Sequence, residues 1–551
     1  MPVNLKSRSI DPSDSSLRDA LEDLQGNILK SHGRNHASHI FLRFSQGKED
    51  DLKRWIAQFA QSITSAYKQL EDVVAWRQSK IDGGLFVHFA LSASGYHKLG
   101  FVEESDQPMG SNPRHRSKGQ EPTDFYVNAF AKGMKFRQEA LQDPRSEEWE
   151  AQYQDDIDAL IILADNDPSL ITSKEREIAQ QLQVTVGKGM ESIAEIIHVE
   201  EGFVLRQEFA VSDGKQSRNF SAVVEHFGYT DGISQPLFLT DDLTKNERRV
   251  GTTNWNPAAA LDLVLVKDPH GKSNDSFGSF LVFRKLEQNV QGFRRAEQTL
   301  SRELNTSADF AGAMAVGRFK DGSPLVLSEK TGNWIQDPHD PNRFHAPNDF
   351  EYRNNDSQGL KCPFQAHIRK SNPRKESVRS GGPFAQDDSE ELGHRIVRRG
   401  IPYGGELNTS NDLTELPTGG VGLLFMCYQA DICEQFEFIQ RFWCNNPVFL
   451  EPAFSEGTTN KNKDYDKTGL DAVIGQSQDS PDPEIGEIPL PPKNWIKDWG
   501  STIQSLNLEK EEEFGQFVTL KGGEYFFSPS ISFLKNLDSG QKETTPLAEV
   551  V

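Results

Sequence analysis

The sequence predicts an α+β fold built from two domains of similar design. The chain has 551 residues, which at roughly 150 residues per domain gives two to four domains. Short runs of β-branched and aromatic residues alternate with segments of helical periodicity, and the order of these elements in the first half returns in the second half. We place the division near residue 240, so that the expected domains span residues 1–240 and 241–551.

In the first half, strands are expected at His39–Phe44, Gly84–Leu91 and Ile157–Ala164, where β-branched and aromatic residues lie between turn residues. Two segments between and after these strands carry apolar residues at the 3.6-residue period of an amphipathic helix. They are Glu49–Leu70 and Pro168–Gly187. The order strand, helix, strand, strand, helix is typical of an α+β layer structure.

The second half repeats this rhythm. Strands are expected at Leu261–Val266, Gly278–Leu286 and Gly422–Cys427, and helices at Gln288–Leu304 and Ile432–Cys444. No residue-level repeat accompanies the similarity, which therefore rests on the order of the elements.

Polar or proline-rich segments separate these elements. Glu104–Pro122 and Ser371–Leu392 are rich in turn residues, and Ser480–Pro492 contains five prolines, which exclude regular ladder hydrogen bonding. We expect loops at all three segments and a mobile tail from Ser539 onward.

The composition excludes several classes of protein. Lys and Arg number 60 against 82 Asp and Glu, a net charge of −22 that repels phosphate backbones and argues against a nucleic-acid partner. The sequence has neither the ~18–20 consecutive apolar residues of a membrane span nor a secretory signal at its start. We therefore expect no membrane partner and a cytoplasmic location, with the 4 cysteines as free thiols.

The common motifs of hydrolases, nucleotide-binding proteins and zinc enzymes are missing from the sequence. His32, His36 and His39 have the spacing of one helix face, which could grip zinc. However, Gly33 and Asn35 disfavour a helix, and the segment leads into a predicted strand. Ordinary structural histidines are the better interpretation.

Three further segments carry reactive side chains. Asp231 lies in a glycine-rich run, His367 lies among small and apolar residues, and Arg398 and Arg399 lie beside Ile and Val. Taken singly, each has an ordinary explanation: a solvated Asp-Gly turn, a core histidine and ion-paired arginines.

Taken together, six blocks of the sequence resemble the signature blocks of dye-decolorizing peroxidases. The blocks are DLQGNILK (Asp23–Lys30), HFGYTDGISQP (His226–Pro236), GRFKDGSPL (Gly317–Leu325), CPFQAHIRKSNPR (Cys362–Arg374), HRIVRRGIPYG (His394–Gly404) and GGEYFFSPS (Gly522–Ser530). They follow one another over nearly the whole chain, and the length and long loops resemble the larger members of the family.

The resemblance implies two ferredoxin-like domains with antiparallel sheets, with one haem b per chain held in the C-terminal domain. It implies that His367 is the proximal ligand of the haem iron and that Asp471, in GLDAVIGQ, accepts a hydrogen bond from its ring. Arg318 would lie near a haem propionate. Leu423 and Phe425 would form the apolar wall above the iron, although ordinary core packing explains these two equally well.

The resemblance also implies the roles of Asp231 and Arg398. The carboxylate would move a proton between the two oxygens of hydrogen peroxide, and the guanidinium would stabilise the charge that develops as the O–O bond breaks. The product would be a ferryl intermediate (compound I), which dyes, phenols and other aromatic donors reduce. Strand alternation should point Arg399 away from the iron.

A haem carrier or sensor without significant turnover is the alternative function. Such a protein needs His367 but has no reason to have both Asp231 and Arg398, so their joint presence favours the peroxidase. The sequence leaves the oligomeric state open.

Overall fold

The computed structural model describes residues 2–101, 129–186, 189–212, 217–338, 340–377, 388–450, 468–476, 495–496, 498–500 and 514–538. The expected loops at 104–122 and 480–492 and the expected tail from Ser539 lie outside these residues. The expected loop at 371–392 is only partly described, and it contains a short helix, α14 (Asp388–Gly393).

Four strands of the first half form one antiparallel sheet. They are β1 (His36–Phe44), β2 (Phe86–Leu91), β3 (Ala159–Asp165) and β6 (Ala194–Phe203). Their spatial order is β6-β1-β3-β2. Numbered along the chain, this is the 4-1-3-2 order of a ferredoxin-like sheet, as the resemblance implied.

The second half builds a sheet of the same order. Its strands are β10 (Phe277–Gln288), β14 (Ile401–Tyr403), β15 (Gly422–Gln429) and β16 (Val518–Ser528). The pairings β14–β15, β15–β10 and β10–β16 are all antiparallel. The prediction of two α+β units of similar design is therefore confirmed at the level of strand order.

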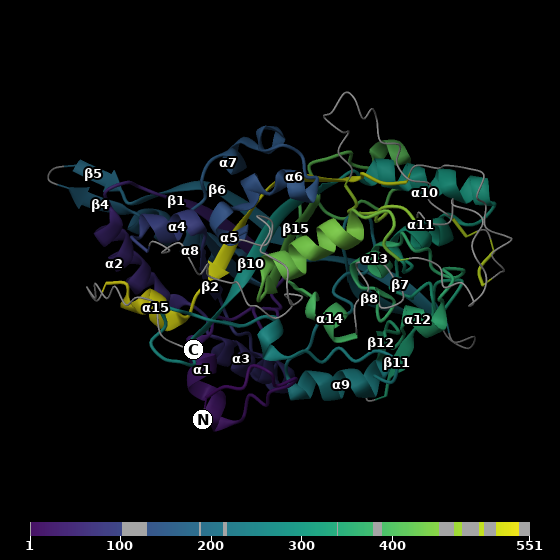
Figure 1. Ribbon diagram of the computed structural model, residues 1–551, viewed down its shortest axis with the longest axis horizontal. Coiled ribbons are helices and arrows are strands. Elements are labelled where there is room, and N and C mark those ends of the chain that lie inside the picture. Colours follow the sequence, from purple (N-terminus) through teal and green to yellow (C-terminus); the bar gives the residue numbers. More distant parts are fainter. Residues whose placement is uncertain are drawn as a thin grey trace, which may run out of the picture.

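The two sheets join at both edges and close into one barrel. Tyr403 of β14 pairs with Gly202 of β6, and Phe527 of β16 pairs with Leu91 of β2. Closure pairs the edge strands of the two sheets with each other. In Figure 1, α2, α4 and α8 lie on one side of the central strands, and α10, α11 and α13 lie on the other. We propose residue 240, at the start of α9, as the boundary between the two domains.

The helices cover the barrel or connect its strands. The α-helices besides α14 are α1 (Arg18–Asp23), α2 (Glu49–Phe59), α3 (Ala66–Ser79), α4 (Ala93–Lys98), α5 (Ala129–Lys132), α6 (Gln138–Leu141), α7 (Ala151–Gln154), α8 (Pro168–Gln181), α9 (Thr240–Val250), α10 (Val290–Leu304), α11 (Ala308–Val316), α12 (Tyr352–Asn355), α13 (His367–Ser371) and α15 (Ile531–Asn536). Two consecutive π-helical segments, η8 (Ile432–Glu437) and η9 (Ile439–Cys444), occupy the expected helix 432–444.

The remaining strands form small hairpins or extend the large sheet. They are β4 (Gln183–Val186), β5 (Gly189–Ser192), β7 (Leu205–Ser212), β8 (Ser217–Val224), β9 (Val266–Lys267), β11 (Ile335–Asp337), β12 (Asp340–His345) and β13 (Val397–Arg398). Short 3-10 turns lie at Ser15–Leu17, Ala60–Ser62, Met134–Phe136, Ser146–Glu148, Leu261–Leu263 and Leu413–Glu415.

Three element predictions were wrong in extent. The single helix expected at 49–70 is two helices, because a 3-10 turn ends α2 and the Ser65 side chain caps a new helix by accepting from the Lys68 amide. The helix expected at 168–187 ends at Gln181, since the β-branched residues after it form β4. The strand expected at 261–266 is mostly a 3-10 turn, followed by the two-residue strand β9.

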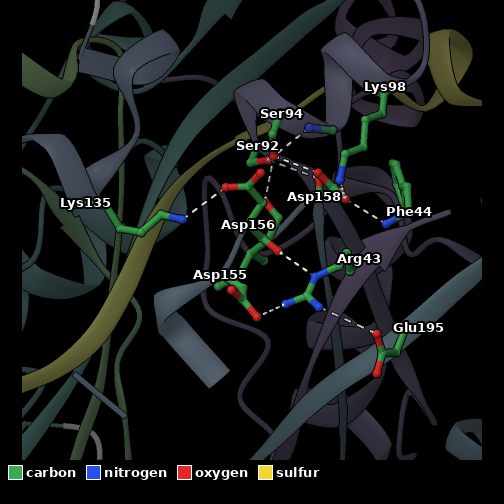
Figure 2. A network of polar contacts seen from close by, with 12 residues as sticks. Arg43, Phe44, Ser92, Ser94, Lys98, Lys135, Asp155, Asp156, Asp158 and Glu195 are labelled. Atoms are coloured by element: carbon green, nitrogen blue, oxygen red, sulfur yellow. Dashed lines mark hydrogen bonds and ion pairs between the residues drawn. The ribbon is translucent and has the colours of Figure 1, made fainter. Parts of the chain in front are cut away.

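A polar network fixes the segment before β3 against the end of β1 (Figure 2). The Asp158 side chain is buried, and its Oδ2 accepts from the Phe44 amide at 2.7 Å and from Lys98 Nζ at 2.8 Å. Nearby, Arg43 forms an ion pair with Asp155 at 2.8 Å. A buried carboxylate with these partners is fully compensated, so we assign the network to folding.

Candidate active site

A cavity of about 280 Å³ lies on the outer face of the second sheet. The side chains of Leu423 and Phe425 line it, whereas Leu424 and Met426 belong to the core cluster that fills the barrel. The two sets alternate because successive residues of a strand point to opposite faces. The two residues that the sequence assigned to an apolar wall therefore do face a cavity.

His367 begins helix α13 and lines the same cavity. Its ring Nδ1 lies 2.9 Å from Oδ2 of Asp471, whose side chain is fully buried. The other carboxylate oxygen accepts from the amides of Val473 at 2.8 Å and Ile474 at 2.9 Å. Because an ionised carboxylate can only accept, Nδ1 donates and Nε2 keeps its lone pair. No described residue hydrogen-bonds to this Nε2.

Opposing effects act on the ionisation of Asp471. Burial alone would raise its pKa, but the neighbouring His367 ring and the amides of Ile474 and Val473 outweigh burial. The pKa of the carboxyl is therefore lowered, and Asp471 stays ionised at neutral pH. An ionised acceptor fixes both the tautomer and the orientation of the His367 ring.

Asp231 and Arg398 meet at another part of the cavity lining. Arg398 Nη1 lies 3.4 Å from Oδ1 of Asp231, and the same oxygen accepts from the Gly232 amide at 2.6 Å. Arg398 Nη2 donates to the Ile233 carbonyl at 2.8 Å. Both side chains are about one-third exposed, at 34% for Arg398 and 30% for Asp231. The pair is thus held together but is open to small molecules.

Arg399 points away from this pair, as strand alternation predicts. Its guanidinium donates to the carbonyls of Asn27 at 2.7 Å and Ile28 at 3.0 Å, in the first block of the resemblance. Burial lowers the pKa of Arg399 to about 10. This arginine fastens the strand that carries Arg398 to the N-terminal segment.

Two further buried arginines line the cavity, Arg318 and Arg374. Both donate to the side chain of Asn348, at 2.9 and 2.6 Å, and their other acceptors are carbonyl or hydroxyl oxygens. Among the described residues, no carboxylate forms an ion pair with either. Burial lowers the pKa of Arg318 to about 10 and that of Arg374 to about 9.

Two buried cations without a counter-charge indicate that the cavity takes an anionic group. The sequence singled out Arg318 but missed Arg374 and Asn348. Arg374 ends the block CPFQAHIRKSNPR, which was a signal for it, whereas Asn348 lies in no block.

Two family models match the chain. The family model described as "DyP dimeric alpha+beta barrel domain" matches residues 23–198. The model described as "Dyp-type peroxidase, C-terminal" matches residues 248–448.

The chain belongs to the dye-decolorizing peroxidase family.

Relatives match over nearly the full length. The chain is 35% identical to the multifunctional dye peroxidase DyP2 of Amycolatopsis sp., over 98% of this chain and 100% of that protein. It is 31% identical to a dye-decolorizing peroxidase of Exidia glandulosa, over 93% and 86%. The crystal structure of a DyP-type peroxidase from Anabaena sp. superposes with a TM-score of 0.74 at 36% identity, covering 97% of this chain and 98% of that one. The structure of DyP2 from Amycolatopsis gives a TM-score of 0.77 at 33% identity, covering 97% and 100%.

As a dye-decolorizing peroxidase, the chain is a haem enzyme that uses hydrogen peroxide to oxidise dyes. The side chains of the cavity fit haem b. Among the described residues, an imidazole whose unprotonated Nε2 is free suits the iron, apolar walls suit the porphyrin, and buried guanidinium groups without a carboxylate partner suit the two propionates.

The three histidines His32, His36 and His39, whose spacing could suit zinc, do not form a metal site in the described residues. His36 and His39 are three residues apart on β1, so their side chains point to opposite faces. Burial lowers the pKa of His39 to about 4 and that of His32 to about 3, so both rings are neutral. Over the described ranges, no three His, Cys, Asp or Glu side chains gather to hold a metal ion, and no helix is long and apolar enough to cross a membrane.

Proposed function

We propose that His367 and Asp471 hold the haem of this peroxidase, and that Asp231 and Arg398 handle the proton and the charge of bound peroxide. The observation that carries the proposal is that His367, Asp231 and Arg398 line one cavity, with a fully buried carboxylate on the histidine. Aromatic donors such as dyes and phenols are the proposed reductants.

His367 supplies Nε2 as the ligand, and Asp471 keeps the proton on Nδ1. This second hydrogen bond raises the basicity of the ring and prevents it from rotating. When bound, the haem supplies the iron that accepts peroxide and the redox capacity that the donors later satisfy. Arg318 and Arg374 would hold the propionates, since both are buried cations with only neutral acceptors.

Asp231 is the proposed proton carrier. Its Oδ1 already accepts from Gly232 and Arg398, whereas its Oδ2 makes no hydrogen bond to a described residue. We infer that Oδ2 takes the proton from one oxygen of peroxide and returns it to the other oxygen as water leaves. The partial exposure of the side chain lets it exchange that proton with solvent.

Arg398 is the proposed electrostatic partner. Its guanidinium is a planar group that carries a fixed positive charge. The bond to the Ile233 carbonyl and the contact with Asp231 hold the planar group in place, so that no reorganisation is needed as negative charge develops on the leaving oxygen. Leu423 and Phe425 would restrict this space to small molecules.

The visible absorption spectrum of the haem-loaded protein tests the proposal. We expect a histidine-ligated ferric spectrum that changes on one equivalent of hydrogen peroxide and returns when a phenol is added. A haem carrier needs the histidine and its carboxylate but not Asp231 and Arg398. A bound haem whose spectrum does not respond to peroxide would favour the carrier and contradict the proposal.

A further inference from the structure

A second cavity, of about 460 Å³, lies where the end of α3, the helix α9 and the strand β12 come together. Figure 1 places α3 and α9 along the same edge of the molecule, with β11 and β12 beyond α9. The residues that line it are Trp76, Arg77, Lys80, Lys245, Arg249 and Arg343. We call it the cationic pocket. None of its residues lines the active-site cavity.

The pocket keeps positive charge in a chain whose net charge is −22. Three of its cations have carboxylate partners, all of which lie outside the lining. Arg77 pairs with Asp241 at 2.6 Å, Lys245 pairs with the same carboxylate, and Arg249 pairs with Asp337 at 3.1 Å.

Lys80 and Arg343 differ from these three. Neither forms an ion pair with a described residue, and both side chains are exposed. Two cations in the lining of one hollow, neither with a carboxylate partner among the described residues, attract an anion.

The same place exposes apolar surface. Trp76 is 48% exposed, and Lys80 Nζ lies 5.4 Å from the centre of its indole ring. Among the residues of the lining, Trp76 supplies the large exposed apolar surface. A simple inorganic anion would leave this indole ring uncovered, so the charge and the aromatic surface together favour an aromatic anion.

We propose that the cationic pocket binds an anionic aromatic molecule, such as an aromatic sulfonate or carboxylate, at a site separate from the haem cavity. A concave site of this volume suits a small molecule, for which pockets of about 300–1,000 Å³ are usual. A flat membrane surface would reach the rim of the hollow but not its walls.

Two chain segments lead from the pocket to residues of the active site. Pro347 lies four residues after Arg343 and, with Asn348, accepts hydrogen bonds from Arg318. Trp255 lies six residues after Arg249 and lines the haem cavity.

Calorimetric titration of the haem-loaded enzyme with naphthalene-1,5-disulfonate tests the charge. Arg343→Glu should weaken binding at least about tenfold. Lys535→Glu on α15 is the matched control, because it changes the net charge equally at an exposed site, and it should change the Kd less than about twofold. Equal weakening in both variants, or no binding to the unmodified enzyme, would overturn the proposal.

Trp76→Leu tests whether the pocket recognises the aromatic ring of the ligand. Because Trp76 is exposed, we expect the substitution to leave folding unchanged. We expect weaker binding of the disulfonate and unchanged binding of inorganic sulfate. Equal effects on both anions would overturn the assignment of an aromatic ligand. Binding of phosphatidylserine vesicles should be measured with the same variants. If Arg343→Glu weakened vesicle binding more than disulfonate binding, the surface would be assigned to a membrane and the proposal would be overturned.

Discussion

Two pairs of side chains line the active-site cavity, and they differ in how firmly the protein holds them. In the histidine pair, His367 and Asp471, the carboxylate is fully buried and accepts three hydrogen bonds of 2.8 to 2.9 Å. In the arginine pair, Asp231 and Arg398, both side chains are about one-third exposed and lie 3.4 Å apart. A ligand must stay fixed, whereas a proton carrier must exchange with solvent and peroxide, so the difference matches the two proposed roles.

The chain around each pair explains the difference. The Asp471 amide donates to the Cys444 carbonyl at 2.8 Å, and the next amide, of Ala472, donates to the Gln365 carbonyl at 3.0 Å. These bonds tie the Asp471 loop to η9 and to the segment before His367. Asp231 instead lies in a turn that contains Gly232, at a φ of 79°. Gly232 allows the chain to turn at this point, and the Asp231 side chain remains about one-third exposed.

The largest expected effect comes from removing the ligand. His367→Ala should reduce the haem content from one per chain to almost none, because no other proposed ligand to the iron remains. The haem-to-protein absorbance ratio after reconstitution measures this. His198→Ala, at a half-buried histidine that pairs with Glu200 away from the cavity, is the control and should load fully. Full haem content in His367→Ala would rule out the proposed ligand.

Removing the guanidinium should leave the histidine pair intact and impair only the chemistry. Arg398→Leu should lower kcat/KM for hydrogen peroxide by about 10²–10³-fold, the usual effect of deleting one preorganised charge-stabilising donor. Haem content should not change. Arg302→Leu, at an exposed arginine on α10, should behave like the unmodified enzyme. Equal rates in both variants would remove Arg398 from the mechanism.

Replacing the carboxylate of Asp471 should affect haem binding more than the peroxide reaction. Asp471→Asn should lower haem affinity by about 10–100-fold, as loss of such a partner does at other metal sites. Haem transfer to an acceptor protein such as apomyoglobin measures the affinity.

The pKa of Asp471 adds a pH dependence to the same variant. Its folded-state pKa is lowered, so its stabilising effect is present above the unfolded-state value of about 3.9 and is lost as the pH falls below it. The unmodified enzyme should therefore lose haem on acidification more steeply than Asp471→Asn. Identical acid profiles would show that Asp471 does not stay ionised beside His367.

The smallest expected effect is a difference in stability between alanine substitutions at two glycines of positive φ, one beside each pair. A Cβ on Gly317 would lie 2.4 Å from Cγ1 of Ile368, next to His367, whereas a Cβ on Gly232 would meet nothing within 4 Å. Both changes to Ala carry the strain of a left-handed backbone, about 1–2 kcal/mol. Gly317→Ala should cost about 1–3 kcal/mol more through overpacking. Urea unfolding measures both, and equal costs would contradict the tighter packing of the histidine side.

Local patterns predicted the barrel strands β1, β2, β3, β10 and β15, but they missed β6, β14 and β16 and some of the turns. The short apolar runs in 278–286 and 422–427 correspond to β10 and β15, because a strand that is covered on both faces needs apolar residues at successive positions. The break between α2 and α3 depends on the Ser65 cap, and the 3-10 turn at Leu261 depends on packing. Neither is visible as a period in the sequence.

The composition of the site was predictable only through the resemblance. His367 and Asp471 are 104 residues apart, and nothing in their spacing indicates that they touch. The sequence blocks marked His367, Asp231 and Arg398. The shared acceptor Asn348 was missed because a single amide in a loop carries no pattern of its own, and only the folded chain shows two buried guanidinium groups bonded to it.

The rate of the peroxide reaction in Asp231→Asn tests the division of roles most directly. Asn keeps the shape of the side chain but cannot carry the proton, so we expect the rate of peroxide consumption to fall by about 10²–10⁴-fold. Its haem content and resting spectrum should equal those of the unmodified enzyme. In the control Asp309→Asn, at an exposed residue, the peroxide rate, the haem content and the resting spectrum should all be unchanged. An unchanged peroxide rate in Asp231→Asn, at full haem content, would contradict the account.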